Sequence, residues 1–349
     1  MLAGACEGGM SLFAGMARAE EGIASADLFR IPYSVPAENL HLFRGRFYLC
    51  YQRGLIRWLE KTNPDALIVE ANPRYLATPF AVKWMRARGR KVIGWGLGAP
   101  WPPSSLRDTP PISERNGGRW RGVWSQFINQ FDALIAYSQR GADEYTALGF
   151  PREKIFVAMN AVAPKPTSPL DFRPLIFDQP SILFVGRLQA RKRVDWLLRA
   201  CAEMERQPRL VIVGDGPERA ALESLAREVY PAAQFAGAKH GAELNPYFAQ
   251  ANLFVLPGTG GLAIQEAMSH GLPVIVAKGD GTQDDLVRET NGWQIPPEEY
   301  DALVGVMREA LTDMNRLRRM GDESRRIVAQ EINLETMVAA FVRALEFVR

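Results

Sequence analysis

Two basic side chains directly after an apolar run are the residues of this sequence best suited to bind an anion. The run Ser181–Val185 ends at Gly186, and Arg187 and Lys192 follow before the next segment of helical period. If the run is a parallel strand, its carboxyl end faces the ligand side of an open α/β sheet. Two fixed cations at that edge can neutralise a diphosphate, whereas the alternative interpretation is a solvated basic loop.

A second segment combines glycines with the start of a helix. Three glycines between residues 258 and 261 follow the apolar run 253–256, and a helix is predicted from about Leu262. Glycine lets a phosphate approach the backbone, and the free N–H groups of a helix start favour an anion. Glu266, one turn into this helix, can accept hydrogen bonds from the two hydroxyls of a ribose. Alternatively, Glu266 only complements the helix dipole.

A third segment, Gly214–Pro217, argues against a dinucleotide-dependent enzyme. It follows the apolar run 209–213 and precedes a helical segment, but the fingerprint G-x-G-x-x-G is incomplete because its third glycine position is Arg219. The segment has the composition of an ordinary turn.

These segments need a sheet to position them, and the hydrophobic pattern predicts two. Short, nearly all-apolar runs alternate with segments of helical period, as in parallel strands covered by helices on both faces. We expect an α/β protein with two Rossmann-like, doubly wound parallel sheets. The predicted strands are 66–69, 91–94, 133–136, 155–158, 181–185, 209–213, 234–235, 253–256 and 273–276, and the predicted helices are 53–61, 78–88, 141–148, 194–204, 218–229, 243–250 and 263–270.

Length and composition fit a two-domain globular protein. The chain has 349 residues, of which 47% are hydrophobic and 23% charged, which excludes disordered and collagen-like proteins. The proline-rich, aperiodic segment 163–169 is typical of a linker. No apolar run approaches the roughly 18 residues that span a bilayer, and the start lacks a signal-peptide pattern, so we expect a cytoplasmic protein. The three cysteines and three histidines are scattered and predict no metal site.

Taken in order, the segments resemble glycosyltransferase family 4, retaining enzymes of the GT-B fold that use nucleotide sugars. The similarity covers roughly residues 180–305 and is carried by FVGRLQARKRVDWLL, LVIVGDGPERAALESLA, FAGAKHGAELNPYFAQANLFVLPG, GLAIQEAMSHGLPVIV and NGWQIPPEEYDAL. The stretch 137–162 resembles the last strand of the family's first domain. The resemblance implies an acceptor-side domain at 1–165 and a donor domain at 166–333 facing it across a cleft. It also implies a terminal helix at 334–349 that packs back on the first domain.

The resemblance also implies roles for single residues. Arg187 and Lys192 would act on the donor diphosphate, and Glu266 would bind the ribose. The donor-binding set implied in this way is Gly186, Gly237, Lys239, Gly260, Gly261, Leu262, Ala263 and Glu266.

Two positions depart from the family pattern. Many members have an acid eight residues before the ribose glutamate and a histidine after a strand of the first domain, where this chain has Gly258 and Leu97. In the implied mechanism the leaving diphosphate takes the proton of the incoming hydroxyl, while Arg187 and Lys192 stabilise its growing charge. This chemistry needs no metal and no cofactor other than the nucleotide sugar, which is a co-substrate.

The first domain has fewer recognisable features. The net charge is +7 for residues 1–165 and −4 for residues 166–349. Basic residues accompany a cluster of tryptophans at 95, 101, 120 and 124 and an amphipathic segment at 41–61, which favours a membrane or sugar contact. Core tryptophans with solvated arginines are the alternative. The turn Glu7–Met10 and the helix-like stretch after it resemble the start of such a domain with its first strand shortened or missing.

We therefore expect a retaining hexosyltransferase that moves a sugar from a nucleotide diphosphate sugar to an acceptor hydroxyl, in cell-envelope or polysaccharide synthesis. Its partners would be the donor and a glycan or lipid-linked acceptor, with peripheral membrane contact through the first domain and no nucleic acid. One alternative is a catalytically degenerate nucleotide-sugar-binding or scaffold protein of this fold. Another is a phosphorylase or epimerase of similar architecture, although no lysine stands out as a Schiff-base residue for a pyridoxal-dependent phosphorylase.

Overall fold

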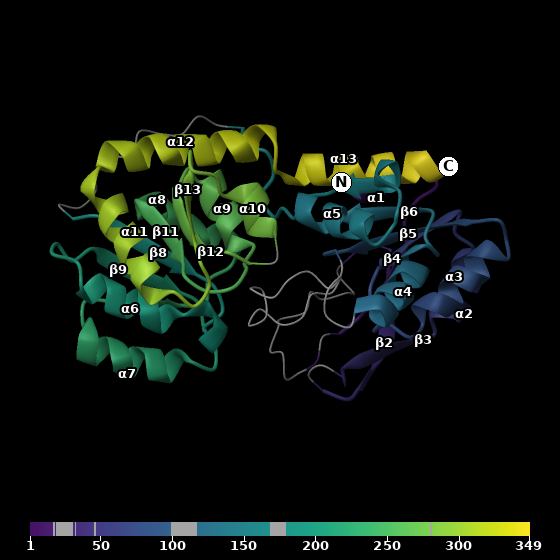
Figure 1. The fold of residues 1–349 in the computed structure, drawn as a ribbon, viewed down its shortest axis with the longest axis horizontal. Coiled ribbons are helices and arrows are strands. Elements are labelled where there is room, and N and C mark those ends of the chain that lie inside the picture. Colours follow the sequence, from purple (N-terminus) through teal and green to yellow (C-terminus); the bar gives the residue numbers. More distant parts are fainter. Residues whose placement is uncertain are drawn as a thin grey trace. The chain divides into compact units, whose positions relative to one another are not determined.

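The chain divides into two compact units. The computed structural model describes residues 1–16, 18, 31, 33–44, 47–98, 117–167, 179–279 and 281–349, with the side chains of 117–121 left aside. Unit 1 comprises Met1–Ala158 with Val338–Arg349, and unit 2 comprises Met159–Met337 (Figure 1). The division falls shortly before the proline-rich segment, of which residues 168 and 169 lie outside the described part.

Unit 2 is built on a six-stranded parallel sheet in the order β10-β9-β8-β11-β12-β13. The strands β8, β11 and β12 are buried at every position, as their apolar sequences predict for a sheet covered on both faces. The edge strand β13 was not predicted from the sequence. The strands are β8 (Ser181–Val185), β9 (Arg209–Val213), β10 (Gln234–Gly237), β11 (Leu253–Leu256), β12 (Val274–Ala277) and β13 (Gly292–Ile295).

The connections of this sheet create a switch point between β8 and β11. The chain runs from β8 through β9 to β10 on one side of β8, then returns to β11 on the other side and continues outward to β13. Ligands of open α/β sheets bind beyond the carboxyl ends of the strands at such a point. The helical elements of unit 2 are η6 (Ala190–Lys192), α6 (Val194–Ala202), α7 (Arg219–Val229), η7 (Gly241–Leu244), α8 (Asn245–Gln250), α9 (Ala263–Ser269), α10 (Thr282–Leu286), α11 (Tyr300–Thr312) and α12 (Met314–Gln330).

Unit 1 contains a second parallel sheet, in the order β4-β5-β6-β7. The last helix, α13 (Leu334–Val348), contributes its residues from Val338 onward to this unit. Its Phe341 packs edge-on against Trp95 with 5.2 Å between ring centroids. The remaining elements are β4 (Ala66–Glu70), β5 (Lys91–Gly96), β6 (Ala133–Ala136), β7 (Ile155–Val157), α2 (Leu55–Thr62), α3 (Thr78–Arg86), α4 (Gly117–Ile128), α5 (Gln139–Ala147) and η5 (Arg152–Lys154).

The first part of unit 1 corrects the sequence-based expectation. After the short helix α1 (Leu2–Ala5) and the turn that follows it, the chain forms a strand, β1 (Leu12–Gly15), and not a helix. Strand β1 pairs in parallel with β2 (Ser34–Leu42), which pairs antiparallel with β3 (Leu49–Arg53). The segment 41–61 is therefore split between a hairpin and α2. Strand β2, which leads into this hairpin, alternates between more and less exposed positions over much of its length, as a strand with one face toward solvent does.

Candidate functional site

Two loops at the switch point of unit 2 carry the residues singled out in the sequence. The loop after β8 carries Arg187 and ends in η6, and the loop after β11 carries the glycines and leads into α9. The two loops are joined by hydrogen bonds. The Thr259 N–H donates to the Arg191 carbonyl at 3.0 Å, and Arg191 Nη1 donates to Thr259 Oγ1 at 3.2 Å.

Lys192 is the most buried cation of this site. Its exposed fraction is 6%, and its Nζ donates to the carbonyl oxygen of Thr259 at 2.6 Å and to that of Gly260. A buried ammonium group has to be paired or hydrogen-bonded, and here two backbone carbonyls of the glycine loop meet that need. The ammonium group is thus fixed against the same backbone that the sequence assigned to phosphate binding.

Gly258 occupies a position where the backbone of the other loop leaves no space for a side chain. A Cβ atom on Gly258 would lie 2.1 Å from the Arg191 carbonyl oxygen and 2.5 Å from Lys192 Cα. The absence of the family's acid at this position therefore has a packing reason, because the turn around Lys192 fills the space.

The next two glycines have backbone conformations that other residues rarely adopt. Gly260 has φ +49° and Gly261 has φ +157°. A Cβ atom on Gly261 would lie 3.5 Å from Lys192 Nζ, which places this backbone beside the ammonium group. Glycine at both positions permits these conformations and leaves no side chain beside the peptide between them.

Arg187 lies near an acid, Asp215, that the sequence analysis did not assign and that pairs with a second arginine, Arg219. The Leu188 N–H donates to the Asp215 carbonyl at 2.9 Å, so the loops after β8 and β9 run together. The N–H of Gly216 and the side chain of Arg219 hold the pKa of Asp215 below its usual value, and Arg187 contributes to this shift. The sequence did not reveal these contacts of Asp215, because Gly214–Pro217 has the composition of an ordinary turn. Arg219 was considered only as the position where the dinucleotide fingerprint would need a glycine.

Glu266 and Gly237 lie on the elements that flank these loops. Glu266 is half-buried on α9, and burial raises the pKa of its carboxyl. Gly237, at the end of β10, accepts a hydrogen bond from the Gly214 N–H at 2.8 Å. A Cβ atom on Gly237 would lie 3.6 Å from Arg219 Nη1, so a cation also borders this loop. Leu262 is 48% exposed at the start of α9, immediately before Ala263.

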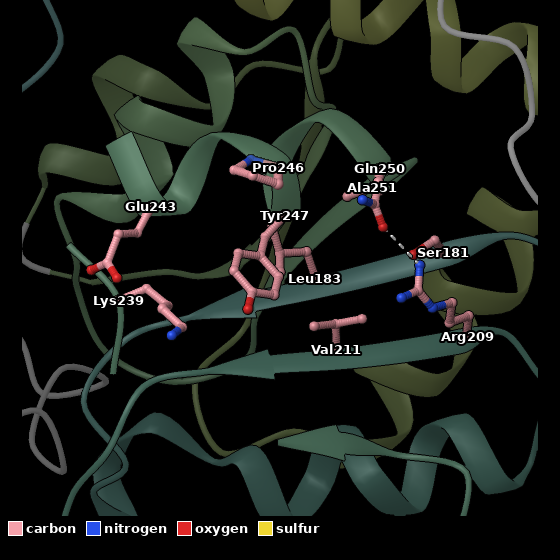
Figure 2. A pocket seen from close by; sticks show the side chains of 10 residues that line it. All are labelled: Ser181, Leu183, Arg209, Val211, Lys239, Glu243, Pro246, Tyr247, Gln250 and Ala251. Atoms are coloured by element: carbon pink, nitrogen blue, oxygen red, sulfur yellow. Dashed lines mark hydrogen bonds between the residues drawn. The ribbon is translucent and has the colours of Figure 1, made fainter. Parts of the chain in front are cut away.

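Lys239 lines a groove of about 370 Å³ between α8 and the strands β8 and β9. Figure 2 shows Lys239 and Glu243 at one end and Arg209 with Gln250 at the other, while Tyr247 points from α8 toward the strands. Arg209 Nη1 donates to Gln250 Oε1 at 3.3 Å. The groove extends to the amino-terminal ends of β8 and β9, away from the edge that carries Arg187. The full lining is Ser181, Leu183, Arg209, Val211, Lys239, Glu243, Pro246, Tyr247, Gln250 and Ala251.

The carboxyl edge of the unit 1 sheet carries polar groups that the sequence analysis missed. Leu97, where the family often has histidine, is 52% exposed after β5. Burial, with a smaller contribution from Glu70 at the end of β4, raises the pKa of Tyr75. Burial, with a smaller contribution from Glu70, raises the pKa of Tyr137 to about 12. These residues lie at or after the ends of β4, β5 and β6, and the sequence analysis assigned none of them except Leu97.

The structure describes the side chains of two of the four tryptophans predicted as a contact surface. Trp95 packs against Tyr137 with 5.0 Å between ring centroids, and Trp124 packs edge-on against Phe127 at 6.1 Å. These two tryptophans thus contribute to packing within unit 1. Trp101 and the Trp120 side chain, like those of Arg107, Arg115, Arg119 and Arg121, lie outside the described part.

Two features are absent from the residues that the structure describes. No helix in that part of the chain is long and apolar enough to cross a membrane. Across the same residues, no group of three or more histidine, cysteine, aspartate or glutamate side chains is arranged to hold a metal ion.

Comparison with known proteins gives matches along most of the chain. Residues 12–165 match Glycosyltransferase Family 4, and residues 179–313 match Glycosyl transferases group 1. A GDP-mannose-dependent alpha-mannosyltransferase from Mycobacterium tuberculosis is 32% identical over 229 residues, which are 60% of this chain and 59% of that protein. A sulfoquinovosyl transferase from Arabidopsis thaliana is 30% identical over 165 residues, 46% of this chain and 30% of that protein. The chain therefore spans less than two thirds of the length of either relative.

The fold also matches solved structures. An Anabaena protein crystallised with UDP has a TM-score of 0.66 and 19% identity, covering 83% of this chain and 81% of that chain. With the apo form of a lipopolysaccharide outer core galactosyltransferase the TM-score is 0.64, at 19% identity and coverages of 83% and 77%. At such identity the match concerns the fold alone, two parallel-sheet α/β domains of the GT-B type.

Proposed function

This chain belongs to glycosyltransferase family 4, and from that membership we propose that it transfers a hexose from a nucleotide diphosphate sugar to an acceptor hydroxyl with retention of configuration. The observation that carries the proposal is Lys192, held by the carbonyls of the Gly258–Gly261 loop at the switch point of the unit 2 sheet, with Arg187 in the same loop after β8. Cations and exposed backbone at this edge suit a diphosphate.

In the proposed reaction the donor diphosphate binds between Arg187, Lys192 and the glycine loop. The bond between the sugar and the diphosphate breaks, and the acceptor oxygen bonds to the same carbon on the same face. The acceptor proton passes to an oxygen of the leaving diphosphate. Arg187 and Lys192 stabilise the charge that develops there, which is greater in the transition state than in the bound donor. Because these two cations supply the positive charge, the proposed transfer is metal-independent.

The remaining predicted residues bind the nucleotide in this proposal. The charged carboxylate of Glu266 accepts hydrogen bonds from the ribose hydroxyls, while Gly237 and Lys239 border the base. The related mannosyltransferase supports a hexose donor, and relatives named for amylovoran and colanic acid biosynthesis support a role in polysaccharide or glycolipid synthesis. We place the glycan or lipid-linked acceptor at the carboxyl edge of the unit 1 sheet, where Glu70 and Tyr137 offer polar contacts.

A degenerate scaffold protein is the second candidate, because Gly258 and Leu97 replace residues that are common in the family. A thermal-shift screen of nucleotide diphosphates and their sugars tests the donor site, since a ligand that binds only the folded state raises the melting temperature. We expect a shift with one nucleotide and its sugars. No shift with any of them would refute the donor site, and binding without release of nucleotide from any sugar donor would favour the scaffold.

We also propose that the β2–β3 hairpin seats unit 1 on an anionic membrane surface. Phe43 and Phe47 are 70% and 64% exposed beside Arg44, so apolar and cationic groups share the hairpin tip. Such a combination suits the interface of a bilayer with anionic lipids.

Vesicle co-sedimentation tests this contact with a double variant, Phe43→Ser with Phe47→Ser. We expect wild-type binding to vesicles that contain phosphatidylglycerol at low salt, weaker binding at high salt, and little binding by the variant. Phe80→Ser is the matched control, because Phe80 is 61% exposed on α3 and should leave binding unchanged. Equal binding by the double variant would place the contact elsewhere.

A further inference from the structure

A buried glutamine near the glycine loop has a side chain that the fold leaves unsatisfied. Gln283 lies on α10 with an exposed fraction of 0%, and within the described part of the chain neither its Oε1 nor its Nε2 has a hydrogen-bond partner. Asn291, equally buried, shows the usual situation, because its Nδ2 donates to Leu286 O at 3.2 Å and its Oδ1 accepts from Arg288 N at 2.7 Å. An unsatisfied buried amide destabilises the fold, so its presence calls for a reason.

The position of this amide supplies a reason. Nε2 of Gln283 lies 3.9 Å from the point where a Cβ atom of Gly260 would be, and Oε1 lies 2.4 Å from the corresponding point of Gly279. The amide therefore packs on Gly279, and its Nε2 also lies near Gly260 of the glycine loop. The carbonyl oxygen of Gly260 is at present a hydrogen-bond acceptor for Lys192 Nζ. Gly260 thus accepts a hydrogen bond from Lys192, and a second donor, Gln283 Nε2, which hydrogen-bonds nothing in the described residues, lies close to it.

We propose that Gln283 is a positioning residue that stabilises the donor-bound form of the glycine loop, an inference that rests on the proposed donor site. When the diphosphate draws an N–H of Lys192 to itself, the carbonyl of Gly260 turns to Gln283 Nε2. In a trans peptide the C=O of Gly260 and the N–H of Gly261 point in opposite directions, so the same rotation turns the Gly261 N–H toward the phosphate. Glycine on both sides permits this rotation.

This arrangement links the two cation-bearing loops to donor binding. In the structure the Lys192 ammonium binds two backbone carbonyls, whereas the Gln283 amide has no hydrogen-bond partner among the described residues. In the bound state both are satisfied, since Lys192 binds phosphate and Gln283 binds the released carbonyl. The unsatisfied amide thus favours the bound form of the loop, at the expense of stability in the empty protein.

The variant Gln283→Met separates this role from a structural one, because methionine has similar length and no hydrogen-bonding N–H. Without nucleotide, we expect a melting temperature equal to or above that of the wild type, since an unsatisfied amide is removed. Isothermal titration with UDP and with GDP should show that the variant binds its nucleotide with a Kd about three- to tenfold higher than that of the wild type. This is the effect of one neutral hydrogen bond. The matched control is Asn291→Leu, which should lower the melting temperature and leave Kd unchanged.

Three results would overturn the proposal. Equal Kd for wild type and Gln283→Met would show that Gln283 does not act on the donor loop. A melting temperature lowered as in Asn291→Leu would make Gln283 an ordinary structural residue. Failure of the wild type to bind any nucleotide diphosphate would refute the donor site together with this inference. This outcome is seen with the wild type alone, whereas failure of the inference alone appears only when the variant binds nucleotide as well as the wild type does.

Discussion

Restoring an acidic side chain at position 258 should damage the site instead of improving it. A Cβ atom on Gly258 would meet the Arg191 carbonyl at 2.1 Å and Lys192 Cα at 2.5 Å, and both contacts are with backbone. Backbone atoms cannot rotate away as the end of a flexible side chain can. Gly258→Ala and Gly258→Asp should therefore separate the loops that follow β8 and β11.

The expected cost has two parts. Forcing one extra group into a packed site costs about 1–3 kcal/mol. Separation of the loops also breaks the 3.0 Å hydrogen bond from the Thr259 N–H to the Arg191 carbonyl, worth about 1 kcal/mol. The free energy of unfolding of unit 2 should fall by about 2–4 kcal/mol, and the melting temperature by roughly 4–16 °C for a unit of this size. Displacement of Lys192 should lower nucleotide affinity in the same variants.

Differential scanning calorimetry and isothermal titration measure these two effects. Gly305→Ala is the control, because a Cβ atom on Gly305 meets nothing within 4 Å and alanine favours the helix α11 in which it lies. This control should be as stable as the wild type or more stable. A melting temperature of Gly258→Ala equal to that of the wild type would refute the packing explanation for the missing acid.

Two further predictions concern the charges of the site. Arg187→Ala and Lys192→Met should each lower turnover by about 10²–10³-fold, which is the usual loss when one group that stabilises developing charge is removed. Steady-state assays with a proven donor measure this loss. Wild-type rates in either variant would contradict the diphosphate assignment. Because burial raises the pKa of Glu266, its carboxylate takes up a proton at a higher pH than an ordinary glutamate, so nucleotide affinity should fall as the pH is lowered through that pKa. The variant Glu266→Gln should bind the nucleotide about 10–100-fold more weakly at neutral pH. Titration calorimetry should also show that its affinity no longer falls as the pH is lowered. A variant with the pH profile of the wild type would refute the ribose contact.

The sequence predicted the elements that position the candidate donor site because each depends on local patterns. The continuous apolar runs of β8 and β11 identified buried parallel strands, and the residues that follow such strands meet at one edge of the sheet. Arg187, Lys192 and the glycine loop could therefore be placed together before their contacts were known. The β1–β3 sheet was missed because its alternation is short and both of its faces are partly exposed.

Other parts of the site depend on contacts that a linear sequence does not contain. The packing of Gly258 on the Arg191 carbonyl joins two loops separated by seven intervening elements of the chain. Gln283 looked like an ordinary polar residue, and only its burial next to Gly260 and Gly279 makes it unusual. Asp215 was hidden for the same reason, since a turn sequence does not reveal which loop it meets.

The stereochemistry of donor turnover tests the central claim most directly. Proton NMR can follow the purified chain with each α-linked nucleotide diphosphate hexose, first with water and then with candidate glycan acceptors. The account predicts release of the nucleotide diphosphate and an α-configured sugar as the first product, with both signals lost in Arg187→Ala. A β-configured first product would contradict the retaining mechanism, and nucleotide binding without turnover of any donor would contradict the transferase itself.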